Sequence, residues 1–269
     1  MITKRIIDEK GIDQTEDTVL VLGYFDGLHK GHQALFEKAR EIATEQGLKI
    51  AVLTFPESPK LAFVRYQPEL MLHLASPEDR MAQLESLGVD YLYLIDFTSH
   101  FAGNTARDFF EKYVSRLRAK AVVAGFDYHF GSDRKESHEL RDYFNGKIVI
   151  VPSVNLDNRK ISSTRIRETI TVGDMLKTQE LLGYPLSTRG IVVHGNARGR
   201  TIGYPTANLA PLDRVLLPGD GVYVADVEHN GQRYRGMASV GKNVTFDGDE
   251  LRFEVNIFDF SQDIYGDTI

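Results

Sequence analysis

The feature that most constrains the fold is a glycine-rich decapeptide, G-Y-F-D-G-L-H-K-G-H, at residues 23–32. An apolar run from Val19 to Leu22 precedes it, and apolar residues at helical spacing follow it from Leu35 to Ala43. The decapeptide is therefore predicted to be a loop that joins a buried strand to a helix. Glycines let backbone N–H groups approach a ligand closely, and the helix start adds a partial positive charge. Together these features favour an anion such as a phosphate.

Two histidines, His29 and His32, flank the predicted helix start. Imidazoles at that point can donate hydrogen bonds to phosphate oxygens as negative charge builds on them, without a covalent intermediate. We therefore predict nucleotidyl transfer at this loop, with both histidines catalytic. A zinc site is the other specific interpretation, but H-x-x-H lacks the i, i+4 spacing and the nearby glutamate of a zinc hydrolase. The remaining alternative is that this segment has no functional role, so that the glycines only shape a turn and the histidines are solvent-exposed.

The decapeptide resembles the H-x-G-H loop of the nucleotidyltransferase superfamily. In its longer form it is similar to the adenylyltransferase half of the bacterial bifunctional riboflavin kinase/FMN adenylyltransferase (FAD synthetase) family. The resemblance implies that ATP and FMN bind at residues of this loop and at the end of the following strand, namely Gly23, Tyr24, Phe25, Asp26, Gly31 and Thr54.

A second segment, I-S-S-T-R-I-R at residues 161–167, begins another predicted helix. Hydroxyl and N–H groups at a helix start, with arginines close by, make a second phosphate-binding end, although a serine there also serves as an ordinary helix cap. In the resembled family this segment contacts the ATP phosphates, which implies roles for Ser163, Thr164 and Arg167. The intermediate family motif is matched by G-F-D-Y-H-F-G at 125–131 and assigns Asp127 to the nucleotide site.

Short apolar runs alternate with helical patterns through the first 183 residues. This alternation predicts an α/β, Rossmann-like domain with a mostly parallel sheet, whose ligand crevice lies at the carboxyl ends of the strands. Asn104 is expected to cap one helix. The other predicted elements are strands at 48–55, 89–97, 121–124 and 148–151, helices beginning at Ser76 and near Asn104, and a weakly helical polar run at 133–145.

The pattern changes after Gly173, and a short helical stretch, 175–182, is followed by β runs rich in Gly, Val and Tyr. We place the domain boundary near residue 184, which gives domains 1–183 and 184–269. Asn230-Gly231 between two such runs is a strong hairpin signal. Several short antiparallel strands predict a small β-barrel.

The barrel segment contains G-R-T-I-G-Y-P-T-A-N at residues 199–208, which is not a Walker A loop. The Thr206 hydroxyl and Asn208 carbonyl are hard oxygen ligands suited to Mg²⁺. The stretch resembles the magnesium- and ATP-binding motif of riboflavin kinases. That resemblance implies nucleotide binding by Gly199, Arg200 and Gly203, and makes Glu254 the base that deprotonates the ribityl 5′-hydroxyl.

The chain departs from the family pattern at several points. The stretch Pro56-Glu57-Ser58-Pro59 stands where a Pro-His-Pro element is usual, Val244 where Pro is common, and Asn256 where His is usual. The family also continues with another strand and a helix beyond the point where this chain stops, Ile269. We therefore expect a C-terminally incomplete barrel with weak kinase activity.

The composition of the chain argues against some classes of binding partner. A net charge of −6 argues against a general nucleic-acid binder, and no uncharged run approaches the length of a membrane span. The absence of cysteine is compatible with a cytoplasmic enzyme.

We predict an enzyme that converts riboflavin to FMN and FMN to FAD with Mg²⁺-ATP. The alternatives are a monofunctional adenylyltransferase with an inactive barrel, a barrel that only binds flavin as a regulatory module, and transfer of AMP or CMP to another acceptor.

Overall fold

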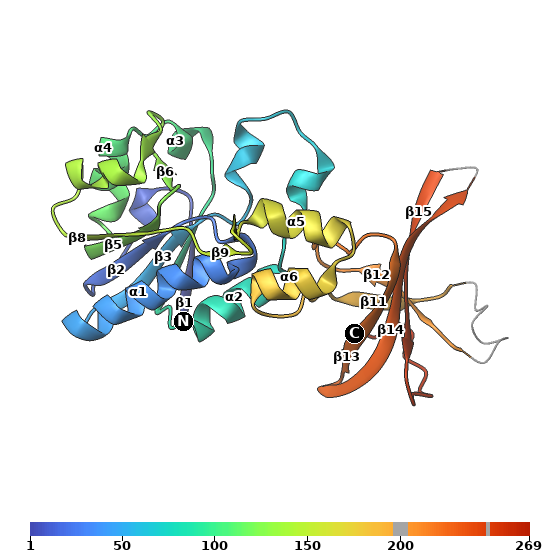
Figure 1. The fold of residues 1–269 in the computed structure, drawn as a ribbon. Coiled ribbons are helices and arrows are strands. Elements are labelled where there is room, and N and C mark those ends of the chain that lie inside the picture. Colours follow the sequence, from blue (N-terminus) through green and yellow to red (C-terminus); the bar gives the residue numbers. More distant parts are fainter. Residues whose placement is uncertain (196–203, 246–247) are drawn as a thin grey trace. The chain divides into compact units, whose positions relative to one another are not determined.

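The structure is a computed structural model that describes residues 1–195, 204–245 and 248–269 (Figure 1). The chain divides into two compact units. Unit 1 comprises Met1–Leu72, Pro77–Ser163 and Leu181–Gly183, and unit 2 comprises His73–Ser76, Thr164–Glu180 and Tyr184–Ile269. The long C-terminal part of unit 2 begins at the residue where we placed the domain boundary, while two earlier segments also belong to it. The division at residue 184 therefore stays a prediction.

Unit 1 contains a six-stranded sheet in the order β1-β4-β3-β2-β5-β8, and every neighbouring pair in it is parallel (Figure 1). This confirms the predicted Rossmann-like α/β fold. Its strands are β1 (Ile2–Ile6), β2 (Thr18–Leu22), β3 (Lys49–Thr54), β4 (Tyr91–Ile95), β5 (Ala119–Gly125) and β8 (Lys147–Val151).

Both faces of this sheet are covered, as Figure 1 shows. Alternate β2 residues point to opposite cores: Val19 and Val21 pack with the apolar face of α1, while Leu20 and Leu22 pack with an aromatic cluster on the other face. Burial on both faces explains why the strands read as unbroken apolar runs. The flanking helices are α1 (Lys30–Gln46) and α2 (Pro77–Ser86) on one face, and α3 (Ser99–Ala102), α4 (Ala106–Phe109) and the π-helical turn η5 (Phe110–Val114) on the other.

The strand order reverses at β2, because the chain continues to β3 and β4 on one side of it and to β5 and β8 on the other. In open α/β sheets the ligand crevice forms at the carboxyl ends of strands where the order reverses. The loop that begins at Gly23 directly follows β2 and so occupies this position.

The first strand, β1, was not expected from the sequence. It pairs in parallel with β4, from Ile2 opposite Tyr91 to Ile6 opposite Ile95. Only Ile6 of its five residues is buried, so the strand lacks the apolar alternation from which strands are predicted. Pairing with a distant strand decides its conformation.

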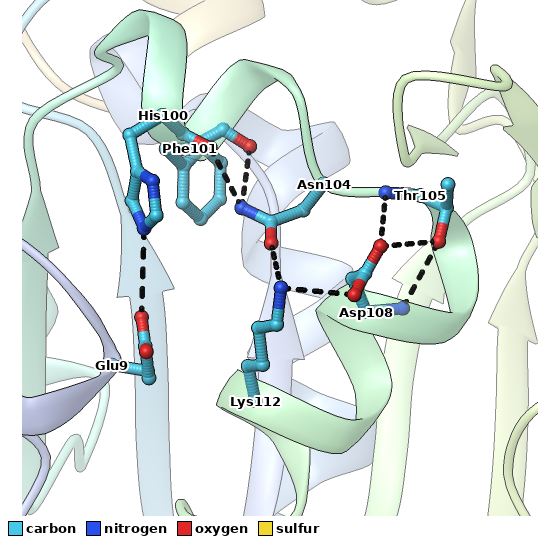
Figure 2. Close-up of polar contacts among 7 residues, drawn as sticks. All are labelled: Glu9, His100, Phe101, Asn104, Thr105, Asp108 and Lys112. Atoms are coloured by element: carbon cyan, nitrogen blue, oxygen red, sulfur yellow. Dashed lines mark hydrogen bonds and ion pairs between the residues drawn. The ribbon is translucent and has the colours of Figure 1, made fainter.

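The predicted cap at Asn104 is wrong by one residue. Helix α4 begins after Thr105, whose hydroxyl accepts the Asp108 N–H at 3.2 Å, while the Asp108 carboxylate accepts the Thr105 N–H at 3.1 Å. Figure 2 shows this reciprocal pair. The Thr-x-x-Asp spacing supplies a complete capping box, whereas Asn104 has no acidic residue at that spacing.

The buried side chain of Asn104 instead joins α3 to the following turn (Figure 2). Its Nδ2 donates to the carbonyls of His100 and Phe101 at 3.0 and 2.9 Å, and its Oδ1 accepts from Lys112 Nζ at 3.0 Å.

Asn104→Ala removes the partners of three polar groups, so we expect a loss of about 1–3 kcal/mol in unfolding free energy. A lowered melting temperature by circular dichroism would show it, with the exposed cap variant Thr105→Ala costing about 1 kcal/mol as reference. Equal melting of Asn104→Ala and wild type would contradict the role.

Unit 2 contains the helices α5 (Ser163–Thr171, from Thr164 on) and α6 (Met175–Leu182, up to Glu180) and a five-stranded antiparallel sheet in the order β11-β12-β15-β14-β13. Its inward residues, such as Val227, Val240 and Val255, form one core. This confirms the expected small-barrel architecture. The strands are β11 (Gly190–Val193), β12 (Ala207–Pro211), β13 (Gly221–His229), β14 (Gln232–Thr245) and β15 (Gly248–Ile257).

The predicted Asn-Gly hairpin joins β13 to β14. Both central residues are left-handed, Asn230 with φ 51° and Gly231 with φ 75°, as a type I′ turn requires.

Candidate active sites

The histidine loop is a tightly packed turn. Phe25 has a left-handed φ of 59°, and its ring is 1% exposed. A Cβ at Gly23 would lie 2.7 Å from the Phe25 ring, and one at Gly31 would lie 3.0 Å from the His29 ring. A side chain at Gly23 would therefore collide with the Phe25 ring, and one at Gly31 would make an unusually close contact with the His29 imidazole. The 3-10 turn η2 (Asp26–Leu28) then leads into α1.

His29 is the N-cap of α1, and its Nδ1 accepts the backbone N–H of His32 at 3.3 Å. The two imidazole rings stack with centroids 3.7 Å apart and an interplanar angle of 13°. Since Nδ1 of His29 is an acceptor, its neutral ring carries hydrogen on Nε2 and can donate from there. The sequence predicted that these histidines flank the helix start, and the structure places both there.

Burial lowers the pKa of His29 to about 4, although Asp26 acts in the opposite direction. Burial, followed by the charges of His29, Arg80 and Lys160, holds the pKa of His32 well below 6.5. Both rings are therefore neutral at pH 7. They are hydrogen-bond donors of fixed orientation rather than cations, and the Nδ1 atom of His32 is buried without a protein partner among the described residues.

The other predicted residues of unit 1 lie around this loop. Asp127, after β5, forms an ion pair with Lys160 at 2.5 Å, and both act electrostatically on His29. Ser163, at the start of α5, has its Oγ 3.3 Å from the Asp26 carbonyl. The three sequence motifs of unit 1 thus converge at the end of β2. Thr164 and Arg167 follow on α5, in the second unit.

Arg80 was not predicted from the sequence, yet its side chain reaches the loop. Thr54, predicted as a ligand contact, is fully buried and is bonded to both the Tyr24 carbonyl and Arg80. The available signal was that Arg80 stands four residues before Leu84 and so shares its buried helix face.

A cavity of about 250 Å³ adjoins the carboxyl ends of β3 and β4. Glu57 and Ser58, at the point where the family pattern has Pro-His-Pro, form part of its lining, and Phe97 forms another part. The segment that differs from the family pattern thus lines this surface cavity and is not part of the hydrophobic core.

Unit 2 brings its predicted residues together across two strands. Asn208 on β12 is directly opposite Glu254 on β15. The Thr206 hydroxyl donates to Glu254 Oε2 at 3.1 Å, and Asn256 Nδ2 donates to the Pro205 carbonyl at 2.6 Å. Gly199, Arg200 and Gly203 lie outside the described residues, so their predicted roles stay predictions.

Two family models match the chain: FAD synthetase over residues 11–165 and riboflavin kinase over residues 182–269. This chain belongs to the bifunctional riboflavin kinase/FMN adenylyltransferase family. Relatives with that name are 41% identical in Listeria monocytogenes, over 93% of this chain and 80% of the relative, and 37% identical in Bacillus subtilis, over 96% and 83%. The histidine loop and the T-A-N motif fall within the respective models.

A solved structure from Streptococcus pneumoniae, named a macrolide-efflux protein, is 58% identical to this family member. It covers 100% of this chain and 88% of its own chain, with a TM-score of 0.96. Its fold is thus the same, while its name differs from those of the curated relatives. In the part of the chain that the structure describes, no helix is long and apolar enough to cross a membrane.

Proposed function

We propose that the protein makes both flavin cofactors, phosphorylating riboflavin to FMN in the barrel and adenylylating FMN to FAD in the α/β unit. The observation that carries the proposal is the stacked pair of neutral histidines at the N-cap of α1, at the end of β2. The matches to both family models support two activities in one chain rather than an adenylyltransferase with an inactive barrel.

In the adenylyl transfer, a phosphate oxygen of FMN attacks the α-phosphorus of ATP, and pyrophosphate leaves. His29 and His32 would donate hydrogen bonds to phosphate oxygens as charge builds on them, and the positive end of α1 would add to this. Ser163, at the start of α5, and Asp127, after β5, are proposed nucleotide contacts. The recess beside Glu57 is our proposed position for part of the flavin, since it is partly apolar and its lining begins at Pro56, next to Phe55, whose carbonyl shares the Arg80 guanidinium with the Tyr24 carbonyl.

In the phosphorylation, the ribityl 5′-hydroxyl attacks the γ-phosphorus of ATP, and ADP leaves. Glu254 would take the hydroxyl proton, because its carboxylate faces the Thr206 hydroxyl across the strand pair. The Thr206 hydroxyl, in turn, holds the carboxylate in one orientation.

Magnesium is the metal that we propose for the barrel. The hydroxyl of Thr206 and the carboxamide oxygen of Asn208 are the oxygen donors that we propose for it, because Mg²⁺ prefers oxygen ligands and usually keeps water and substrate phosphates as its remaining ligands. When bound, the ion would neutralise phosphate charge.

Since ATP is consumed twice and the chain has no cysteine, we propose that the enzyme works in the cytoplasm.

Chromatography of the products tests the proposal. The protein is incubated with Mg²⁺-ATP and either riboflavin or FMN, and we expect FMN in the first reaction and FAD in the second. FAD without FMN formation would favour the monofunctional alternative. Flavin binding without ATP turnover in the barrel would favour a regulatory module, and no FAD from FMN would favour another acceptor.

A further inference from the structure

Arg80 joins the ends of two neighbouring strands. Its Nη1 donates to the Phe55 carbonyl at 2.8 Å, and its Nη2 donates to Thr54 Oγ1 at 2.7 Å and to the Tyr24 carbonyl. Thr54 Oγ1 donates to the same Tyr24 carbonyl at 2.9 Å. Tyr24 follows β2, and Thr54 ends β3. One side chain from α2 thus fixes the two strand ends beside the histidine loop.

The charge of Arg80 is buried, and its guanidinium bonds to carbonyl and hydroxyl oxygens. The residue is 9% exposed, and the carboxylates of Asp26 and Glu57 act on it electrostatically. Burial lowers the pKa of Arg80, and its Nε has no hydrogen-bond partner among the described residues. Burying a cation is costly, and the hydrogen bonds to the two strand ends offset part of that cost.

The anchored carbonyl belongs to the residue directly before the strained turn. Phe25 follows Tyr24 with a left-handed φ of 59°, and its buried ring contacts the His32 ring edge-on at 5.3 Å. The Tyr24 peptide therefore fixes the backbone of Phe25, and the Phe25 ring limits the orientation of His32. Movement of this carbonyl would move a catalytic imidazole.

We propose that Arg80 is a positioning residue for adenylyl transfer, which acts through Tyr24 and Phe25 on His32, with Thr54 as the second member of the anchor. The inference rests on the proposed FAD-forming activity of this unit. The planar guanidinium is needed because one side chain must donate in two directions at once, which a single ammonium on a flexible stem does less well.

The test compares Arg80→Met, Arg80→Lys and a control, Arg40→Met, which makes the same change at an exposed helical position of α1. We expect kcat for FAD formation to fall about 100-fold in Arg80→Met, since a small misplacement of a catalytic group has that effect. Arg80→Lys should lose about 10-fold, and Arg40→Met should match wild type. Riboflavin phosphorylation by the same samples should be unchanged, because its residues lie in the other unit.

The pH profile tests the electrostatic coupling between Arg80 and His32. The charged or titratable groups that act on His32 are His29, Arg80 and Lys160, and Arg80 lowers the pKa of His32. Removal of the positive charge should therefore raise this pKa, so the acid limb of kcat/KM moves to higher pH in Arg80→Met but not in Arg80→Lys. A residue that only supports folding would lower the melting temperature and leave kcat of the folded enzyme unchanged.

A folded Arg80→Met enzyme with the wild-type rate and acid limb would overturn the proposal. If Arg80→Met does not fold, Thr54→Val decides, because it deletes the hydroxyl that bonds both Arg80 and Tyr24 with little change of shape. We expect about a 10-fold lower rate of FAD formation from it, and a wild-type rate would overturn the anchor. Absence of FAD formation in the wild-type protein would instead refute the proposed function.

Discussion

Replacing His32 by alanine should lower the rate of FAD formation from FMN about 100- to 1000-fold, the usual effect of losing one preorganised donor to a developing charge. The ring is oriented by its stack on His29 and by its edge-on contact with Phe25. Because the pKa of His29 is about 4 and that of His32 is well below 6.5, both donors are neutral in the free enzyme. The wild-type kcat/KM should therefore show no acid limb near pH 6.5.

The control for this prediction is His138→Ala, the same substitution at an exposed position of unit 1. It should retain wild-type FAD synthesis. Riboflavin phosphorylation, measured in the same His32→Ala sample, reports that the chain is folded. His29→Ala should behave like His32→Ala, with an additional loss of about 1 kcal/mol in stability because it removes the N-cap of α1. Undiminished FAD synthesis in both histidine variants would remove the basis of the site.

Glu254→Gln should stop FMN formation from riboflavin, with a loss of about 100- to 10 000-fold, as expected when a general base is removed. The glutamine side chain has nearly the same shape and can still accept the Thr206 hydroxyl, so the loss would come from the proton acceptor and not from packing. FAD formation from supplied FMN should be unaffected, because it takes place in unit 1.

Glu228→Gln is the matched control, since Glu228 is an exposed outward residue of β13 in the same sheet. It should phosphorylate riboflavin like wild type. Asn208→Ala should reproduce the Glu254→Gln result and, unlike it, should also raise the Mg²⁺ concentration needed for half-maximal rate. Full kinase activity of Glu254→Gln would show that another group takes the proton.

Local sequence determined the strand–loop–helix unit, because each of its signals acts within a few residues. Apolar runs specify the buried strands, the glycines allow the turn, and the 3.6-residue period specifies α1. The Asn230-Gly231 hairpin was predictable for the same reason, since a type I′ turn needs two residues that tolerate positive φ. The histidines could be identified as site residues from their place at this helix start.

Long-range contacts decided what the sequence did not show. Strand β1 exists because it pairs with β4, some ninety residues away, and its own pattern carries no strand signal. Asn104 was predicted to be a helix cap from its residue type. The capping box forms between Thr105 and Asp108 instead, and the Asn104 side chain donates to the Phe101 carbonyl of the preceding helix.

The histidine site depends on tertiary structure in the same way. No local signal in the sequence connects Arg80 with the histidine loop, and only the packing of α2 beside the ends of β2 and β3 brings its guanidinium to Tyr24 and Thr54. In the barrel, the register of β12 and β15 sets Glu254 beside Thr206. A sequence specifies which groups are present and their local conformation, whereas the strand order and register specify which of them meet, because those are fixed by pairing between segments far apart in the chain.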